Sequence, residues 1–331
     1  MSELRQDLIS RDWVIVSPER AIRPHEHPAH IAGPCPFCPG QEEMNPAAIE
    51  TIEDEQDRWL LRVVPNKFPA LDTHPLPQTR RGGCWSWPHA EGYGRHEVII
   101  ESRDHATTLG LMPMAAAQRV LSAYVSRFRT LAHEDSRLRQ IIVFRNHGPR
   151  AGASLIHPHS QIIATPVVAP ATRRRTLDEI AFFDTTGHCG RCHLIERERR
   201  SRTRMVLEST HFVTYAPFAS PHPYQLEIVP RRHSADFGGI RRREVDDLTI
   251  HLSRILAALY RLLDDPSYNL VVTGPPLDLI HQGANHWYIE IIPRLTTPAG
   301  FEMGSGIAVN VNAPETSAAA LREAVEATPV D

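Results

Sequence analysis

One pattern occurs twice in the chain, once in each half, and it restricts the possible folds more than any other feature of the sequence. Each copy begins with a Cys-x-x-Cys pair and continues through a Val/Ile-rich segment to a histidine. An amphipathic segment and two further apolar runs follow, with a second histidine between these runs. The two histidines are 52 positions apart in the first half (His105 and His157) and 53 apart in the second (His233 and His286). Elements that keep their order and nearly their spacing indicate a duplicated unit.

The order of elements predicted for the repeated unit is strand–helix–strand–strand. Apolar residues recur every three or four positions in segments 120–131 and 248–259, which predicts one amphipathic helix in each half. Runs rich in Val and Ile and bounded by turn residues predict strands, and they lie at 97–100, 140–144, 225–229, 269–272 and 287–292. The expected fold is therefore α+β, with two duplicated units that are each a largely antiparallel sheet with a packed helix.

The composition changes between the two copies. Segment 165–179 is Pro-rich and basic, so we expect it to connect an N-terminal unit over residues 1–168 to a C-terminal unit over residues 169–331. We expect the two units to join into one sheet or into one compact pseudo-dimer.

Charge and hydropathy exclude several classes of protein. The 331-residue chain has a net charge of −3, which gives no support to bulk binding of nucleic acid or of a membrane surface. No apolar run reaches the roughly 18 residues that a membrane helix needs. The first ten residues carry both charges and lack the apolar core of a secretion signal. We therefore expect a globular protein of the cytoplasm.

The cysteines indicate metal chemistry. Four of the five form the two Cys-x-x-Cys pairs, and Cys84 is left over. In a reducing compartment such pairs indicate metal sites more often than disulfides. Their Pro/Gly-rich, polar surroundings do not suggest the strand-to-helix context of a redox pair. Structural zinc takes four Cys or His ligands. We expect two zinc ions per chain, bound by Cys35, Cys38, His105 and His157 in the first unit and by Cys189, Cys192, His233 and His286 in the second.

The segment 157–161, HPHSQ, places two histidines around a proline in the first unit. Alternate side chains of a strand share a face, so His157, His159 and Gln161 are expected on one side, and Pro158 puts them at a strand start or an edge. A neutral imidazole with one nitrogen held by a hydrogen bond is a good nucleophile towards phosphorus. A nearby amide can donate to phosphoryl oxygens without bringing a charge.

The second unit lacks this combination. It has Tyr288 in the place of His159 and Glu290 in the place of Gln161, so it keeps a metal ligand and has no nucleophile. The simplest interpretation is one active centre per chain.

A Gly-rich segment, residues 146–154, precedes the two histidines. Its small residues Gly148, Gly152 and Ala153 let the backbone approach a ligand closely, and its N–H groups could cradle a phosphate. The alternative is a plain connection between two strands. The neighbouring HPHSQ favours the phosphate interpretation.

Five motifs together carry a resemblance to a known family. The segments "SPERAIRP", "CPFCPG", "VPNKFPAL", "HPHSQI" and "GFEMGSG", in this order, resemble the galactose-1-phosphate uridylyltransferase family of the histidine-triad superfamily. The resemblance runs from about residue 12 to residue 312. It implies two histidine-triad-like units and a ping-pong reaction of galactose metabolism. In that reaction UDP-glucose gives its uridylyl group to a histidine, and galactose 1-phosphate then takes it up.

The resemblance also implies roles for individual residues. His159 would be the nucleophile and Gln161 the contact to the transferred phosphoryl group, while Cys35, Cys38, His105 and His157 would form the structural zinc site. The residues implied around the nucleotide, its phosphates and the sugar are Asn66, Asn146, Ser154, Arg20 and Arg23. Glu302 would bind sugar hydroxyls across a homodimer.

Two departures leave alternatives open. Ser160 stands where the enterobacterial and animal type has glycine, and the second Cys-x-x-Cys pair is absent from that type. Both features also resemble the related plant phosphorylase that acts on ADP-glucose and carries two zinc sites. The alternatives are therefore a nucleotide-sugar phosphorylase with phosphate as acceptor, a hydrolase with water as acceptor, and a non-catalytic zinc module.

Overall fold

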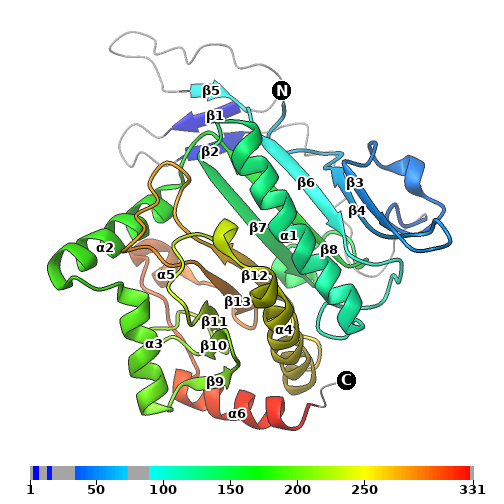
Figure 1. Ribbon diagram of the computed structural model, residues 1–331. Coiled ribbons are helices and arrows are strands. Elements are labelled where there is room, and N and C mark those ends of the chain that lie inside the picture. Colours follow the sequence, from blue (N-terminus) through cyan, green and yellow to red (C-terminus); the bar gives the residue numbers. More distant parts are fainter. Residues whose placement is uncertain (1–2, 7–12, 17–33, 74–88, 329–331) are drawn as a thin grey trace.

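A ten-stranded antiparallel sheet forms the centre of the protein (Figure 1). The computed structural model describes residues 3–6, 13–16, 34–73 and 89–328. The strands of the large sheet, in spatial order, are β3 (Glu50–Glu53), β4 (Trp59–Pro65), β6 (Arg95–Ile100), β8 (His159–Thr165), β7 (Gln140–His147), β12 (Tyr268–Thr273), β13 (Tyr288–Pro293), β11 (Leu226–Pro230), β10 (Phe212–Tyr215) and β9 (Met205–Glu208). A small second sheet has the order β2 (Trp13–Val16), β1 (Glu3–Gln6), β5 (His89–Glu91).

The large sheet is symmetric about its middle. The first half of the chain contributes β3-β4-β6-β8-β7, and the second contributes β12-β13-β11-β10-β9, which is the same order in reverse. The halves meet where β7 pairs with β12, from His147 opposite Tyr268 to Val143 opposite Val272. The predicted strand–helix–strand–strand unit is confirmed twice, and the two units form one sheet. The hairpins β3–β4 and β9–β10 were not predicted.

The helices α1 (Met114–Glu134) and α4 (Arg242–Leu263) cover one face of this sheet (Figure 1). Their buried apolar stripes pack on each other and on alternate strand residues from both halves, such as Ile99, Ile162, Ile228 and Ile289. Because successive side chains of a strand point to opposite faces, the residues between these turn to the other face. His159 and Gln161 belong to that second face.

The connection between the halves is more ordered than the sequence suggested. Segment 165–179 leads into α2 (Pro170–Thr186), and α3 (Gly190–Ser201) follows it. Pro170 stands in the first turn, where its missing N–H costs no hydrogen bond, and Gly187 ends α2 with φ of 72°. Only Thr172 and Thr176 of α2 are buried, so the helix has no apolar stripe that its sequence could reveal. The division at 168/169 stays a prediction.

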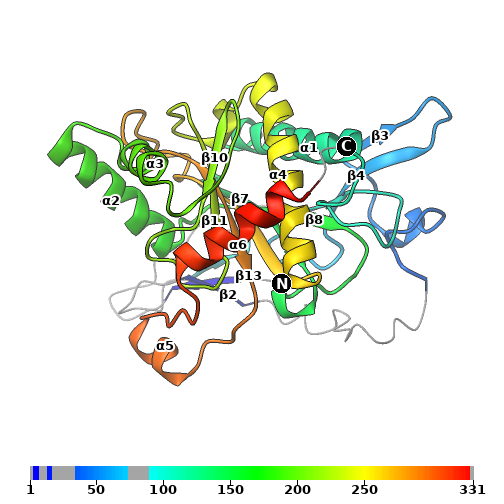
Figure 2. The ribbon, with the colours of Figure 1, turned by 90° about the horizontal axis from the view of Figure 1, so that it is seen from below.

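Two shorter helices complete the described chain. These are α5 (Gly300–Ser305) and α6 (Pro314–Glu326), and α6 packs against α4 through Ala318, Leu321 and Val325. Figure 2 shows α5 projecting from the body of the protein on the side away from α1. Within the described residues, no helix has both the length and the apolar character needed to cross a bilayer.

Gly110 tests how tightly the two units pack on each other. A Cβ atom at this position would lie 2.7 Å from Leu256 Cβ and 2.8 Å from the backbone nitrogen of Ala257, both on α4. Gly110→Ala should therefore lower the free energy of unfolding by about 1–3 kcal/mol, as overpacking does elsewhere. Urea unfolding measures the change. Gly304→Ala, where a Cβ meets no atom within 4 Å, is the control. Equal stabilities of the two variants would contradict the close packing.

Candidate active site and metal centres

His159 is held in one tautomer by its own backbone neighbourhood. The side chain is buried at the start of β8, and its Nδ1 lies 2.8 Å from the carbonyl oxygen of His157. A carbonyl only accepts, so Nδ1 carries the proton and the neutral ring has its lone pair on Nε2. The ring also contacts the edge of Phe37, with centroids 5.3 Å apart. The ring is thus oriented as a nucleophile requires.

Gln161 lies two residues further along the same face of β8. Its Oε1 is 2.9 Å from Nε2 of His96. The other ring nitrogen of His96, Nδ1, accepts a hydrogen bond from the backbone N–H of Ala70. His96 therefore donates from Nε2 to Gln161. Nδ2 of Asn66 lies 3.5 Å from the same oxygen. With its oxygen engaged, the Gln161 carboxamide turns its NH₂ group away from His96 as a hydrogen-bond donor.

His96 was missed by the sequence analysis. It is buried at the head of β6 and lines a cavity of about 370 Å³ together with Asn66, Arg95 and Asp72. Nothing in the local pattern distinguishes it from the histidines to which the sequence assigned no role. Its role depends on a contact with a residue 65 positions later in the chain.

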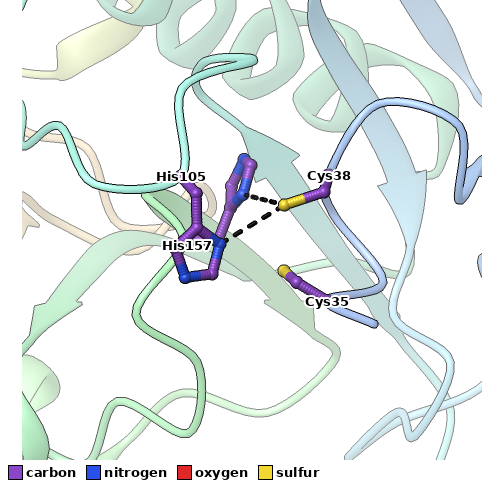
Figure 3. Close-up of side chains that lie close together, drawn as sticks. All are labelled: Cys35, Cys38, His105 and His157. Carbon is purple, nitrogen blue, oxygen red and sulfur yellow. Dashed lines mark hydrogen bonds between the residues drawn. The ribbon is translucent and has the colours of Figure 1, made fainter. Parts of the chain in front are cut away.

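The first predicted ligand set is brought together (Figure 3). One ligand atom from each of Cys35, Cys38, His105 and His157 lies within 4.8 Å of all the others. Cys38 Sγ is 3.3 Å from Nδ1 of His105 and 3.6 Å from Nδ1 of His157. Tetrahedral zinc with ligands at about 2.0–2.3 Å separates its ligands by about 3.3–3.8 Å. The four side chains therefore have the spacing that a metal ion needs.

The ring nitrogen of His157 that does not face the cluster fixes the orientation of its side chain. His157 donates from Nε2 to the carbonyl oxygen of Ser102 over 2.8 Å, which leaves the lone pair on Nδ1, towards Cys38. Burial lowers the pKa of His157 to about 4, so the ring is neutral at pH 7, the form that binds a metal.

The second predicted ligand set has the same geometry. Cys192 Sγ lies 3.5 Å from Nδ1 of His233 and 3.5 Å from Nδ1 of His286, and Cys189 Sγ lies 3.7 Å from His286. His286 donates from Nε2 to the Pro230 carbonyl over 3.0 Å, as His157 does to Ser102. Burial lowers the pKa of His286 as well. Both clusters could hold a metal ion.

The surroundings of the second pair correct one detail of the sequence analysis. Cys189 is the residue before α3 and Cys192 lies in its first turn, so this pair opens a helix. The segment before it is helix α2 and a turn, whereas a thioredoxin-like pair follows a strand. The pair still lacks the redox context.

In the second unit, Tyr288 takes the position of His159, and other side chains of the chain pack against it. The guanidinium of Arg191 lies over the Tyr288 ring, 3.4 Å from its centroid, and pairs with the carboxylate of Glu227. Arg191 stands between Cys189 and Cys192 as Phe37 stands between Cys35 and Cys38. Gln225 donates to Glu290 over 2.9 Å, where the first unit has the pair of His96 and Gln161. These side chains take the positions that Phe37, His96 and Gln161 have around His159 in the first unit.

The Gly-rich segment forms a tight loop after β7. Gly148 and Gly152 have φ of 76° and 83°, and residues 149–151 form a 3-10 turn. The N–H groups of Ala151, Gly152 and Ala153 donate to carbonyls of the same loop. These three N–H groups are thus engaged inside the loop, and contact of this loop with a phosphate stays a prediction. Asn146 accepts from Asn269 on β12 over 2.8 Å.

The remaining predicted residues lie elsewhere. Arg20 and Arg23, like Cys84, fall outside the described residues. Ser154 lies in the loop before His157 and is partly buried. Glu302 lies on α5, where its carboxylate accepts a hydrogen bond from the Ala299 N–H over 3.0 Å. The binding roles predicted for these residues stay predictions.

Removal of one cysteine tests the first cluster. Cys35→Ser should lower the metal content by about one ion per chain and destabilise the fold, because metal binding free energy at such a site is also folding free energy. Elemental analysis and thermal unfolding measure the two effects. His159→Gly is the control, and it should keep the full metal content because His159 bonds to a carbonyl. Metal loss in His159→Gly would mean that His157 and His159 have exchanged roles.

Comparisons with known proteins agree over the whole chain. A family model described as the N-terminal domain of galactose-1-phosphate uridyl transferase matches residues 1–169. ADP-glucose phosphorylase of Arabidopsis thaliana is 34% identical over 330 residues, with 97% of this chain and 92% of the plant protein covered. Galactose-1-phosphate uridylyltransferase of Thermotoga maritima is 28% identical and covers 98% of both chains.

Solved structures give the same relationship. The crystal structure of the Arabidopsis thaliana ADP-glucose phosphorylase with bound ADP-glucose superimposes with a TM-score of 0.78 at 34% identity, over 98% of both chains. A structure of uridylyltransferase gives a TM-score of 0.83 at 27% identity, over 99% of both chains. With one family model and full-length relatives in agreement, this chain belongs to the galactose-1-phosphate uridylyltransferase family of nucleotidyltransferases.

Proposed function

We propose that the protein transfers a uridylyl group from UDP-glucose to galactose 1-phosphate through a covalent intermediate on His159. The observation that supports this most directly is the hydrogen bond from Nδ1 of His159 to the His157 carbonyl. It fixes the tautomer whose Nε2 can attack phosphorus. Galactose-1-phosphate uridylyltransferases are among its full-length relatives.

The reaction divides into two displacements at the α-phosphorus. In the first, Nε2 of His159 forms a bond to the α-phosphorus of UDP-glucose, and the bond from that phosphorus to the bridging oxygen breaks. Glucose 1-phosphate leaves with the bridging oxygen and its electron pair. In the second, a phosphate oxygen of galactose 1-phosphate attacks the same phosphorus, and the P–N bond breaks. UDP-galactose leaves and His159 returns to its neutral form.

Two neighbours lower the barrier of both steps. The His157 carbonyl accepts a hydrogen bond from Nδ1 of His159 throughout the reaction. In the covalent intermediate the His159 ring carries a positive charge, and this hydrogen bond stabilises it. The NH₂ group of Gln161 donates to a non-bridging oxygen of the transferred group, with the amide held by His96. We assign zinc to both Cys/His clusters, on the basis of two sulfur and two imidazole donors each. Metal ions bound by these residues would hold the loops that carry the four ligands of each cluster in place.

A second candidate is the phosphorolysis of ADP-glucose through the same intermediate. It is favoured by the 34% identity to ADP-glucose phosphorylase and by the second Cys/His cluster. Here inorganic phosphate resolves the intermediate in place of galactose 1-phosphate. A hydrolase would use water at the same step.

Isotope exchange distinguishes these reactions. The enzyme is given UDP-glucose and radiolabelled glucose 1-phosphate without another acceptor, and ADP-glucose is tested in parallel. Label in UDP-glucose shows a reversible uridylyl-enzyme, whereas label in ADP-glucose alone supports the phosphorylase. Release of nucleoside monophosphate without an acceptor shows hydrolysis. No exchange in metal-replete enzyme would contradict the ping-pong reaction.

His159→Gly tests the nucleophile. Exchange should fall by at least about 10⁴-fold, because loss of a covalent nucleophile leaves only binding and electrostatic stabilisation. Tyr288→Phe is the matched control at the equivalent place of the second unit, and its exchange rate should stay within about twofold of the wild-type rate. A His159→Gly enzyme that still exchanges label would remove the nucleophile from this scheme.

We also infer that the chain forms a homodimer through the segment around α5. Large apolar side chains are exposed here in close succession, with Met303 81% and Val311 75% exposed. Phe301, Ile307 and Val309 are more than half exposed as well. Such a patch on one segment indicates a protein interface. Glu302 lies within it and would then reach the active site of the second copy.

A charge in this patch tests the dimer. Met303→Asp should shift the protein towards monomer, because the interface would then bury an unpaired carboxylate. Analytical ultracentrifugation measures the change. Leu177→Asp, on the exposed side of α2, is the control and should leave the association unchanged. If both variants sediment like wild type, the α5 segment is not the interface. The cytoplasmic location stays a prediction.

A further inference from the structure

A buried polar network lies directly behind the HPHSQ segment. Ser160 stands between His159 and Gln161 and therefore points to the opposite face of β8, towards α1. Its hydroxyl donates to the carboxylate of Glu101 and contacts the hydroxyl of Tyr124. Tyr124 also lies 3.4 Å from Glu101. Ser160 is 0% exposed.

An ion pair completes this network. Nε of Arg145 lies 3.2 Å from both carboxylate oxygens of Glu101, and Nη1 donates to the Tyr268 hydroxyl of the second unit over 3.1 Å. The side chains of Arg145 and Glu101 are 2% and 0% exposed. A buried ion pair rarely stabilises a fold more than well-packed apolar residues would, because both charges lose their hydration. Its presence in the core therefore needs another reason.

The second unit shows that the fold itself does not require the network. Ile289 takes the place of Ser160, because each lies one residue before the equivalent pair Glu290 and Gln161. In the first unit, the register of β7 with β8 puts Arg145 opposite Ser160. In the second unit, Val272 on β12 is opposite Ile289 on β13, so Val272 is the counterpart of Arg145.

The place of Glu101 is apolar as well. Ile99 pairs with Ser160 in the first unit, and Ile228 pairs with Ile289 in the second. The residue two positions after Ile99 is Glu101, and the residue two positions after Ile228 is Pro230. The same fold position is thus apolar where the nucleophile is absent and ionic where His159 is present.

The network is joined to the nucleophile by short backbone links. The N–H of Glu101 donates to the Pro158 carbonyl over 3.1 Å, and the Ser102 carbonyl accepts from His157 over 2.8 Å. Together with the bond from Ser160, these contacts attach the end of β6 to the HPHSQ segment on both sides of His159. A shift of this strand would move the His159 ring relative to a bound phosphorus.

We propose that Ser160, Glu101 and Arg145 are positioning residues that hold His159 in line with the α-phosphorus of the bound nucleotide sugar. This inference rests on the proposed nucleotidyl transfer through His159. The three residues touch no substrate and act through the strand that carries the nucleophile. Small displacements of a nucleophile slow a displacement reaction strongly while ground-state binding is kept. The proposal therefore requires an effect on kcat and none on KM.

Ser160→Ala is the first test, with label exchange as the assay. We expect kcat to fall about 10- to 100-fold, with the KM for the nucleotide sugar, the metal content and the pH–rate profile unchanged. Thr214→Val, which removes a buried hydroxyl bonded to His251 in the second unit, is the matched control. It should lower the melting temperature and leave kcat as in wild type.

A double variant separates positioning from stability. Glu101→Leu with Arg145→Val removes both charges together and gives the core the apolar character of the second unit. We expect a melting temperature equal to or above that of wild type and a kcat that falls at least as far as in Ser160→Ala. An unchanged kcat in both variants would overturn the proposal.

A fall in kcat together with metal loss, a raised KM or a shifted pH–rate profile would also overturn it. Failure of the wild-type enzyme to exchange label would instead contradict the proposed function, so the two failures are distinguishable.

Discussion

The pairing of β7 with β12 is the interaction on which the rest of the structure depends. It joins the inner edges of two duplicated units by backbone hydrogen bonds and makes one ten-stranded sheet from them. Because both units then share a face, α1 and α4 lie beside each other and bury a common apolar core. The same junction lets Tyr268 of the second unit reach Arg145 of the first.

Duplication explains why the two halves resemble each other, and burial explains how they differ. In both Cys/His clusters a backbone carbonyl near the end of a strand accepts a hydrogen bond from the second histidine nitrogen. Beside them, the first unit has Phe37 and His159, whereas the second has Arg191 stacked on Tyr288. The second unit thus places its own charged side chain against the residue that takes the position of His159. A Cys/His cluster that could hold a metal ion is present in both.

Fixed hydrogen bonds orient the side chains of His159 and Gln161 in the first unit. A backbone carbonyl sets the tautomer of His159, and His96 sets the direction of the Gln161 amide. Neither contact needs a change of protonation before the reaction begins. Donors and acceptors that are already oriented lose little free energy to reorganisation when charge develops. The buried charges lie one layer behind, on the opposite face of β8.

The sequence by itself determined the repeat, the two helices and five strands of its units, and which eight Cys and His residues come together in two clusters. These features follow from the periodicity and spacing of residues, which can be recognised in the amino-acid sequence without knowledge of the fold. Tertiary structure alone decided the roles of His96, Arg191 and Glu101, and the helical character of 170–186. His96 and Gln161 are 65 positions apart, and Glu101 and Ser160 are 59 apart. Contacts at such separations depend on which strands become neighbours, and only the pairing of the whole sheet fixes that.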